Sequence, residues 1–122
     1  MSRLSEELRQ RTKNFASEVI RLYIKLPKSR DEVKVLGHQL LRSGTSVAAH
    51  AREASRARFE SEFCSKLDGL LQEADESQMW LELLRDDCDI QGDQIDRLHH
   101  EAGELMAIFI TLVSKIRQKM KS

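Results

Sequence analysis

The strongest constraint on the fold lies between residues 63 and 88, where apolar or small side chains recur at alternating steps of four and three residues. These positions are Phe63, Leu67, Leu70, Ala74, Ser77, Leu81, Leu84 and Cys88. A repeat of about 3.5 residues places them along one side of an α-helix, in the a and d positions of a heptad. We therefore predict a helix over residues 59–89 that packs against other helices along its whole length.

Three further segments show a helical apolar period and predict helices over residues 3–26, 30–56 and 93–120. Their stripes are Leu4, Leu8, Phe15, Val19, Leu22 and Leu26; Val33, Leu36, Leu40, Ser43, Val47, Ala51 and Ala54; and Ile95, Leu98, Ala102, Leu105, Phe109, Leu112 and Ile116. Helices joined by such short links are expected to run antiparallel to their neighbours. The sequence thus predicts an all-α, up-down-up-down four-helix bundle, and 122 residues suit a single domain over residues 1–122.

Several residues indicate where the predicted helices begin and end. Pro27 ends the first helix, because proline pushes the preceding residue out of the helical region. Ser29 stands three residues before Glu32, and this spacing predicts a capping box at the start of the second helix. Gly92 suits the C-terminus of the third helix, with Asp93 as the N-cap of the fourth.

Small residues dominate the second half of the second predicted helix. Gly37 and Gly44 each cost about 1 kcal/mol of helix propensity relative to Ala, so a packing role for them is expected. Thr45, Ser46 and Ala48 continue the run of small side chains. We therefore predict that a neighbouring helix approaches this helix closely.

Membrane insertion, secretion and disulfide formation are not indicated. No stretch approaches the roughly 18 consecutive apolar residues of a membrane span, and residues 1–13 lack the apolar region of a signal peptide. Cys64 and Cys88 lie on one continuous helical pattern and would be roughly 36 Å apart, too far to pair. We expect a cytoplasmic protein whose cysteines are small buried hydrophobic residues.

The sequence also lacks the usual signatures of catalysis and metal binding. It contains no Glu-x-x-His motif, Gly-rich phosphate loop, Gly-x-Ser-x-Gly elbow or Cys-x-x-Cys pair. Asp96 and His99 are the nearest match to a metal motif, and we interpret them as a surface pair. His99 and His100 are adjacent and point about 100° apart on a helix. We expect no enzymatic activity, no metal and no cofactor.

Charge is unevenly distributed although the formal net charge is zero. Residues 1–30 contain 8 basic and 3 acidic side chains, whereas residues 59–91 contain 2 basic and 10 acidic ones. Candidate nucleic-acid-binding residues are Arg42, Arg52, Arg56 and Arg58, with Lys28 and Arg30 as additions. Two interpretations remain open: the arginines contact nucleic-acid phosphates, or they form salt bridges to the acidic third helix, within or between subunits.

Apolar residues beside the main stripes indicate self-association. In the third helix they are Met79, Trp80 and Leu83, and in the first helix Ile20, Tyr23 and Ile24. They widen the apolar arc beyond what a single bundle needs. We take Met79, Trp80, Leu83 and Tyr23 as candidate oligomer-interface residues.

Residues 39–85 contain a series of specific short motifs in a fixed order, namely Gln39-Leu40, Arg42-Ser43, Thr45-Ser46-Val47, Arg52-Glu53-Ala54, Arg56-Ala57-Arg58, Glu62-Phe63, Lys66-Leu67, Glu73-Ala74, Glu76 and Trp80-Leu81-Glu82-Leu83-Leu84. In these motifs the chain resembles the bacterial four helix bundle protein family, also called the 23S rRNA intervening-sequence protein family. The family includes the accessory variability determinants of diversity-generating retroelements. Two positions depart from its pattern: His50 stands where Asn is usual, and Phe59 where a Ser N-cap is usual.

The resemblance implies an antiparallel four-helix protomer that assembles into a ring-shaped homopentamer, with a basic surface for nucleic acid. Some relatives are encoded within 23S rRNA genes, and others are partners of a reverse transcriptase. The function expected is that of a non-catalytic oligomeric protein that binds the RNA or DNA backbone. The alternative is a scaffold for protein–protein interaction with no nucleic-acid role.

Glu53 and Lys66 are both positions of the family pattern. They are expected near the same level of the hairpin formed by the second and third helices. We hypothesise that they form a polar network that fixes the register of these helices.

Overall fold

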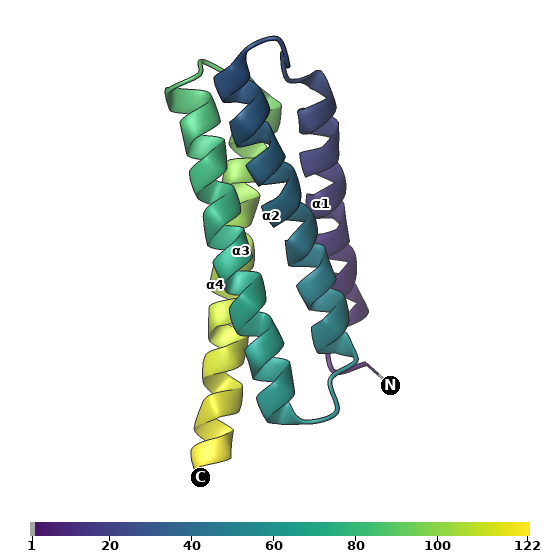
Figure 1. Cartoon of the computed structure of the whole chain (residues 1–122). Helices are drawn as coiled ribbons and strands as arrows, with labels where there is room; N and C mark the ends of the chain where they lie inside the picture. Colours follow the sequence, from purple (N-terminus) through teal and green to yellow (C-terminus); the bar gives the residue numbers. More distant parts are fainter. Residues whose placement is uncertain (1) are drawn as a thin grey trace.

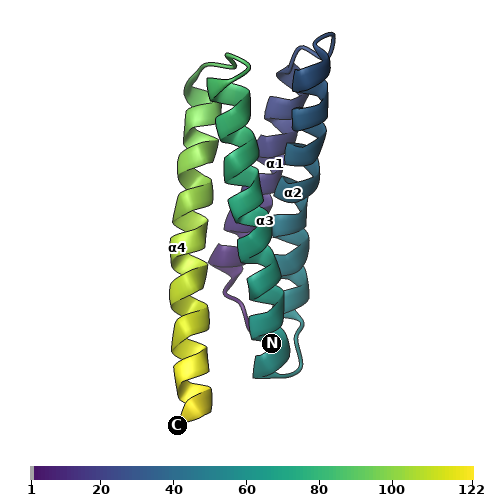
Figure 2. The same cartoon turned by 60° about the vertical axis from the view of Figure 1, so that its left-hand side comes forward.

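The computed structural model describes residues 2–122, which fold into four antiparallel α-helices (Figure 1). The helices are α1 (Glu6–Lys25), α2 (Asp31–Ser55), α3 (Glu60–Asp86) and α4 (Asp93–Lys121). Each packs closely against the next helix in the chain, whereas α1 and α4 pack more loosely. The predicted all-α architecture of four helices is thus confirmed. The last turns of α4 project beyond the α2–α3 turn (Figure 2).

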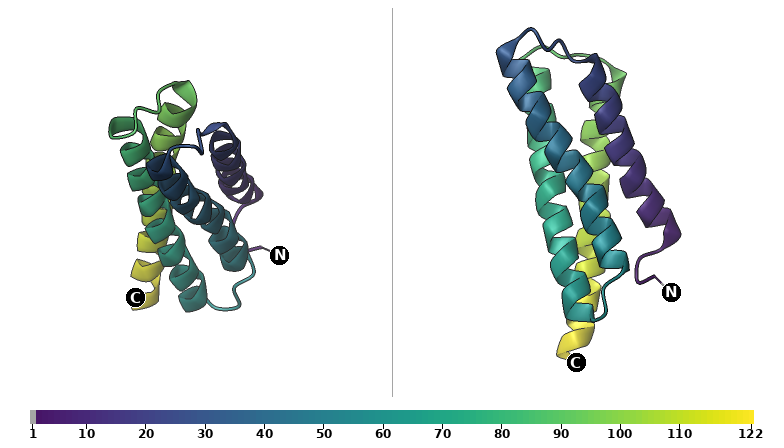
Figure 3. Two further views of the ribbon diagram at one scale, coloured as in Figure 1. Left: turned by 45° about the horizontal axis from the view of Figure 1, so that its top comes forward. Right: turned by 45° about the vertical axis from the view of Figure 1, so that its right-hand side comes forward.

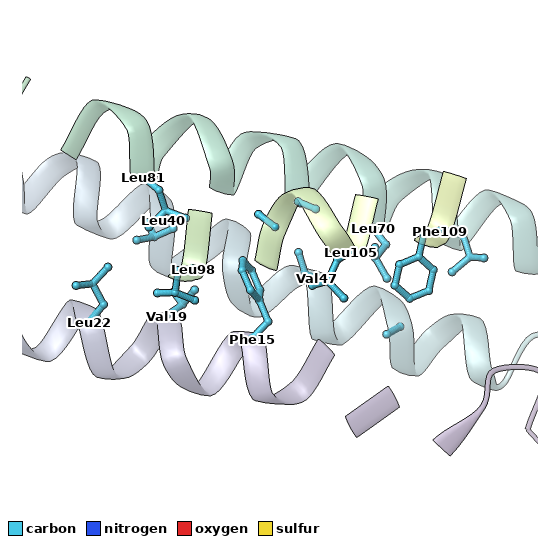
Figure 4. Packing of buried hydrophobic residues seen from close by; sticks show 14 of the residues in the cluster. Phe15, Val19, Leu22, Leu40, Val47, Leu70, Leu81, Leu98, Leu105 and Phe109 are labelled. Carbon is cyan, nitrogen blue, oxygen red and sulfur yellow. The ribbon is translucent and has the colours of Figure 1, made fainter. Parts of the chain in front are cut away.

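The core runs along the bundle axis and is built from the predicted stripes. Every stripe position from Phe63 to Leu84 in α3 is buried. Figure 4 shows Val19, Leu40, Leu81 and Leu98, one from each helix, pointing toward one another.

The apolar stripe of α4 departs from its prediction near the C-terminus. Val113 is 5% exposed, whereas Leu112 and Ile116, which the heptad pattern predicts to be inside, are only partly buried. A straight helix turns every 3.6 residues, so its buried face drifts away from a strict 3.5-residue repeat. The stripe therefore shifts by one position over the length of this helix.

A hydroxyl pair links α2 to α3 inside the core. Ser43 and Ser77 are both 0% exposed, and their Oγ atoms lie 2.7 Å apart. The Ser77 hydroxyl also lies 2.8 Å from the carbonyl oxygen of Glu73, and the Ser43 hydroxyl lies 3.3 Å from that of Leu40, so either hydroxyl can donate to the other. The bond between the two hydroxyls forms only when Ser43 and Ser77 lie at the same level, so the pair favours this register of α2 on α3.

The close approach predicted for the glycines of α2 is present, and the neighbour is α1. A Cβ atom at Gly44 would lie 2.8 Å from Cγ2 and 3.1 Å from Cβ of Val19. At Gly37, a Cβ atom would lie 2.9 Å from Cδ1 of Leu26. These two glycines therefore set the distance between α1 and α2.

The capping box predicted at Ser29 is wrong. The N-cap of α2 is Arg30, which makes no side-chain cap hydrogen bond, and Ser29 lies in the turn that follows Pro27. The backbone N–H of Arg30 donates to the carbonyl of Pro27 at 3.3 Å, which closes that turn. The Glu32 carboxylate instead accepts from Arg30 Nε at 3.0 Å. The backbone N–H of Glu32, followed by this contact with Arg30, lowers the pKa of Glu32.

The α3–α4 link also differs from the prediction, because α3 ends at Asp86 rather than at residue 89. Cys88 therefore lies outside the helix, although it is buried. Asp89 has a φ of 58°, a left-handed conformation that ends helices, and Ile90 N–H donates to the Leu84 carbonyl at 3.0 Å. Gly92, with a φ of 132°, is the N-cap of α4, so Asp93 is its first helical residue and not its cap.

The segment before α1 is tied to the α2–α3 turn. Leu4 is buried in the core, and the Arg3 side chain donates to the carbonyl oxygens of Ala57 at 2.9 Å and Arg58 at 2.8 Å. The start of the chain and the end of α2 therefore lie at the same end of the bundle (Figure 3). Within residues 2–122, none of the helices has the length and apolar character of a membrane span.

Candidate nucleic-acid interface

A groove of about 540 Å³ runs between the first half of α1 and the second half of α2. Its inner lining includes the buried side chains of Thr12 and Ala51. The small side chains of Ala48, Ala49 and Ser55 also line the groove. Because none of these side chains is large, the groove remains open between the two helices.

Four exposed cations line this groove: Arg9 and Lys13 from α1, and Arg52 and Arg56 from α2. None has a carboxylate oxygen within 4.0 Å anywhere in residues 2–122. Glu6 is the one acidic residue that lines the groove. The groove therefore carries an excess of positive charge that is not neutralised within the protomer, which suits an anionic ligand.

The geometry of the two helices explains why these cations meet. Arg52 and Arg56 are four residues apart, as are Arg9 and Lys13, so each pair lies on one face of its helix. Antiparallel packing then brings the first half of α1 beside the second half of α2. Of these two pairs, only the α2 pair was predicted from the sequence. The same spacing in the basic segment 1–30 was the signal that could have identified Arg9 and Lys13.

Arg42 does not line this groove and instead contacts α3. Its guanidinium lies 2.9 Å from the Glu76 carboxylate and 3.3 Å from that of Glu73. The hydrogen bond to Glu76 is the main reason that the pKa of Arg42 is raised. Arg42 therefore forms salt bridges to the acidic helix α3 of its own protomer, which is the second of the two interpretations given for the arginines.

The other predicted cations also lie outside the groove. Lys28 and Arg30 lie at the opposite end of the bundle, where Lys28 Nζ donates to the Leu26 carbonyl at 3.1 Å and Arg30 Nη1 to the Cys88 carbonyl at 2.9 Å. Arg58 lies in the α2–α3 turn, near the groove's end, and its side chain is 79% exposed. Its nearest carboxylate is 3.8 Å away. Of the six predicted cations, the structure places two in the groove.

Glu53 and Lys66 do come together, but at the surface. Their charged atoms lie 3.9 Å apart, and the side chains are 52% and 39% exposed. His50 Nδ1 lies 3.3 Å from the other oxygen of Glu53, and its ring lies against Gly69 of α3. An exposed pair at this distance contributes at most about 1 kcal/mol, so packing and the serine pair carry more of the register than this contact does.

The predicted oligomer-interface residues differ in exposure. Met79 is 43% exposed on the outside of α3, whereas Trp80 and Tyr23 pack partly against the protomer's own core. Leu83 is also half-buried. On α1 the outward apolar side chains are Ile20, 41% exposed, and Ile24, 69% exposed. Among the apolar residues beside the main stripes of α1 and α3, the exposed ones are therefore Met79 and these two isoleucines.

The adjacent residues His99 and His100 contact different glutamates. His99 Nε2 lies 2.8 Å from Glu82 of α3, while His100 Nε2 lies 3.5 Å from Glu104. Asp96 faces Arg85 at 3.6 Å instead of His99. Among residues 2–122, no three His, Cys, Asp or Glu side chains gather closely enough to hold a metal ion.

Residues 6–111 match the family model described as 23S rRNA-intervening sequence protein. The chain belongs to the 23S rRNA-intervening sequence protein family. The resemblance seen in residues 39–85 is therefore confirmed and extends over all four helices. The matched range contains all four groove cations of this 23S rRNA-intervening sequence protein.

A solved structure supports the same fold. The chain is 32% identical to a protein of unknown function from the S23 ribosomal protein family of Bacteroides thetaiotaomicron, with a TM-score of 0.78. The similarity covers 87% of this chain and 97% of that one. No curated protein matches this chain significantly. This structural similarity agrees with the four-helix fold of the chain, and the function of that similar protein is itself unknown.

Proposed function

We propose that this protein is a non-catalytic nucleic-acid-binding bundle that holds an RNA or DNA backbone in the groove between α1 and α2. The observation that carries the proposal is the set of four cations that have no ion-pair partner among residues 2–122, namely Arg9, Lys13, Arg52 and Arg56. Arginine side chains left unpaired are free to bind phosphate oxygens, often with two hydrogen bonds each. Contacts to phosphates position a strand without reading its sequence.

The distribution of charge favours a local site over general attraction to polyanions. The formal net charge of the chain is zero, and the acidic residues concentrate in residues 59–91. On α3, Glu73 and Glu76 both pair with Arg42, so the positive charge of this arginine is neutralised within the protomer. A nucleic acid is therefore attracted to the groove rather than to the whole molecule.

Fluorescence anisotropy of a structured RNA and a DNA duplex, titrated with the protein at several salt concentrations, tests the proposal. We expect micromolar or tighter binding at low salt. Four phosphate contacts on B-DNA predict a slope of log K against log salt concentration of about −3.6. Absence of binding even at low salt would refute the nucleic-acid role and favour the alternative, a scaffold for a protein partner.

The family suggests the setting in which such binding takes place. We propose that the protein acts in the cytoplasm, either as the product of an intervening sequence in a 23S rRNA gene or as an accessory protein of a reverse transcriptase. The first setting is supported by the family to which the chain belongs, since that family is described as 23S rRNA-intervening sequence protein. The resemblance of residues 39–85 to retroelement accessory proteins supports the second.

We further propose that the protomers assemble into a ring-shaped homopentamer. The exposed apolar side chains of Ile20, Ile24 and Met79 support self-association, because water-exposed apolar surface is stabilised by burial. Multi-angle light scattering should give five times the 14.1 kDa chain mass, about 70 kDa. Met79→Glu should lower that mass, because a buried unpaired carboxylate opposes assembly. A 14.1 kDa particle at micromolar concentration would contradict the pentamer.

A further inference from the structure

Phe59 is an exposed aromatic residue that contributes little to the fold. It is the N-cap of α3, has an extended backbone, and makes no side-chain cap hydrogen bond. The residue is 61% exposed and lies outside the apolar core. Serine, threonine, aspartate and asparagine are preferred at an N-cap because they accept a backbone hydrogen bond. A phenylalanine here gives up that bond and exposes its ring to solvent.

The backbone around Phe59 is held in place. Arg3 donates to the carbonyl oxygens of Ala57 at 2.9 Å and Arg58 at 2.8 Å. The Arg58 backbone N–H donates to the Glu62 carboxylate at 3.2 Å. These contacts fix the turn on both sides of the exposed ring. The ring is thus presented on an ordered backbone.

Positive charge adjoins the ring. The Arg58 guanidinium carbon lies 5.7 Å from the Phe59 ring centroid. Arg56, a groove cation, is three residues upstream, so its Cα lies within about 11 Å of that of Phe59. At roughly 3.4 Å per nucleotide along one strand, about three nucleotides span this distance. A strand whose phosphates bind the groove can therefore extend to the ring.

We propose that Phe59 stacks against an unpaired base of the bound strand, so that the ligand is single-stranded nucleic acid or an unpaired segment of a structured RNA. This inference rests on the proposed function, since the groove supplies the phosphate contacts. Bases stack on aromatic rings whatever their sequence, because every base has a π-face. In a duplex the faces of the bases are covered by their neighbours, so Phe59 favours unpaired strands.

The test compares wild type with Phe59→Ser, using a single-stranded oligonucleotide, its duplex and an abasic strand of equal length. Serine supplies the missing N-cap acceptor, so a loss of binding cannot be due to a weakened helix start. We expect Phe59→Ser to weaken single-strand binding by about tenfold, within the range for one stacked base. Affinity for the duplex and the abasic strand should stay unchanged. A Phe59→Trp variant, which keeps an aromatic ring, should bind the single strand about as tightly as wild type does.

The outcomes separate this inference from the proposed function. If Phe59→Ser binds the single strand as tightly as wild type does, stacking is refuted while the groove proposal stands. If Phe59→Ser weakens binding to all three ligands equally, the residue acts on the groove and not on a base, and stacking is again refuted. If wild type binds none of the ligands at low salt, the proposed function itself fails.

Discussion

Reversing the charges of Arg52 and Arg56 together, as Arg52→Glu and Arg56→Glu, is expected to weaken nucleic-acid binding by about 100-fold or more. A hydrogen bond to a charged group contributes about 1.5 to 3 kcal/mol, and each 1.4 kcal/mol changes affinity about tenfold. Both side chains are exposed and lack ion-pair partners, so the bundle should remain folded. The loss of favourable charge near the C-terminus of α2 should cost only about 1 kcal/mol of stability. Anisotropy and circular dichroism measure the two effects.

A matched control reverses two exposed cations outside the groove, Lys34 on α2 and Lys115 on α4. Lys34→Glu with Lys115→Glu makes the same change in net charge, so it isolates the position of the charge from its amount. Binding by this control should stay within a few-fold of wild type. An equal loss in both variants would refute the groove as the site. If Arg52→Glu with Arg56→Glu instead dissociates the oligomer, these arginines serve assembly, as the scaffold alternative requires.

Gly44→Ala is expected to destabilise the protein by about 1 to 3 kcal/mol, although alanine is the better helix former. Propensity alone would raise the free energy of unfolding by about 1 kcal/mol. The new Cβ atom would, however, lie 2.8 Å from Cγ2 and 3.1 Å from Cβ of Val19. A β-branched valine in a helix has almost one available rotamer, so relief requires α1 to move away. Urea unfolding measures the change.

Two further variants isolate the cause of the Gly44 effect. In the double variant Gly44→Ala with Val19→Ala the two shortest contacts, with Cγ1 and Cγ2 of Val19, are removed and only the 3.1 Å contact with Cβ remains, so its destabilisation should be smaller than the sum of the single effects. At Gly103 of α4, a Cβ atom would meet only Gln78 Nε2, the end of a flexible side chain, at 3.1 Å. Gly103→Ala should therefore be neutral or stabilising. A higher unfolding midpoint for Gly44→Ala would show that α1 and α2 do not pack rigidly here.

Sequence patterns predicted the helices better than their ends. The stripe from Phe63 to Leu84 is buried as expected, because spacing along one helix alone determines which residues share a face. The capping box at Ser29 failed because Pro27 and Arg30 close a turn with their own backbone hydrogen bond. The end of α3 was placed too late, because the left-handed conformation of Asp89 has no signal in the residue type as clear as that of a glycine.

The sequence by itself determined four amphipathic helices, since apolar residues at helical spacing form a buried face in any bundle. Only the tertiary structure decided which cations remain available to a ligand. Arg42 and Arg52 are both predicted nucleic-acid-binding residues of α2, yet Arg42 faces two carboxylates of α3, while Arg52 faces α1 and a groove lined by small residues. An ion pair between two helices requires its charged atoms to lie within about 4 Å of each other. That distance depends on how the two helices pack, which the spacing of residues along one helix does not determine.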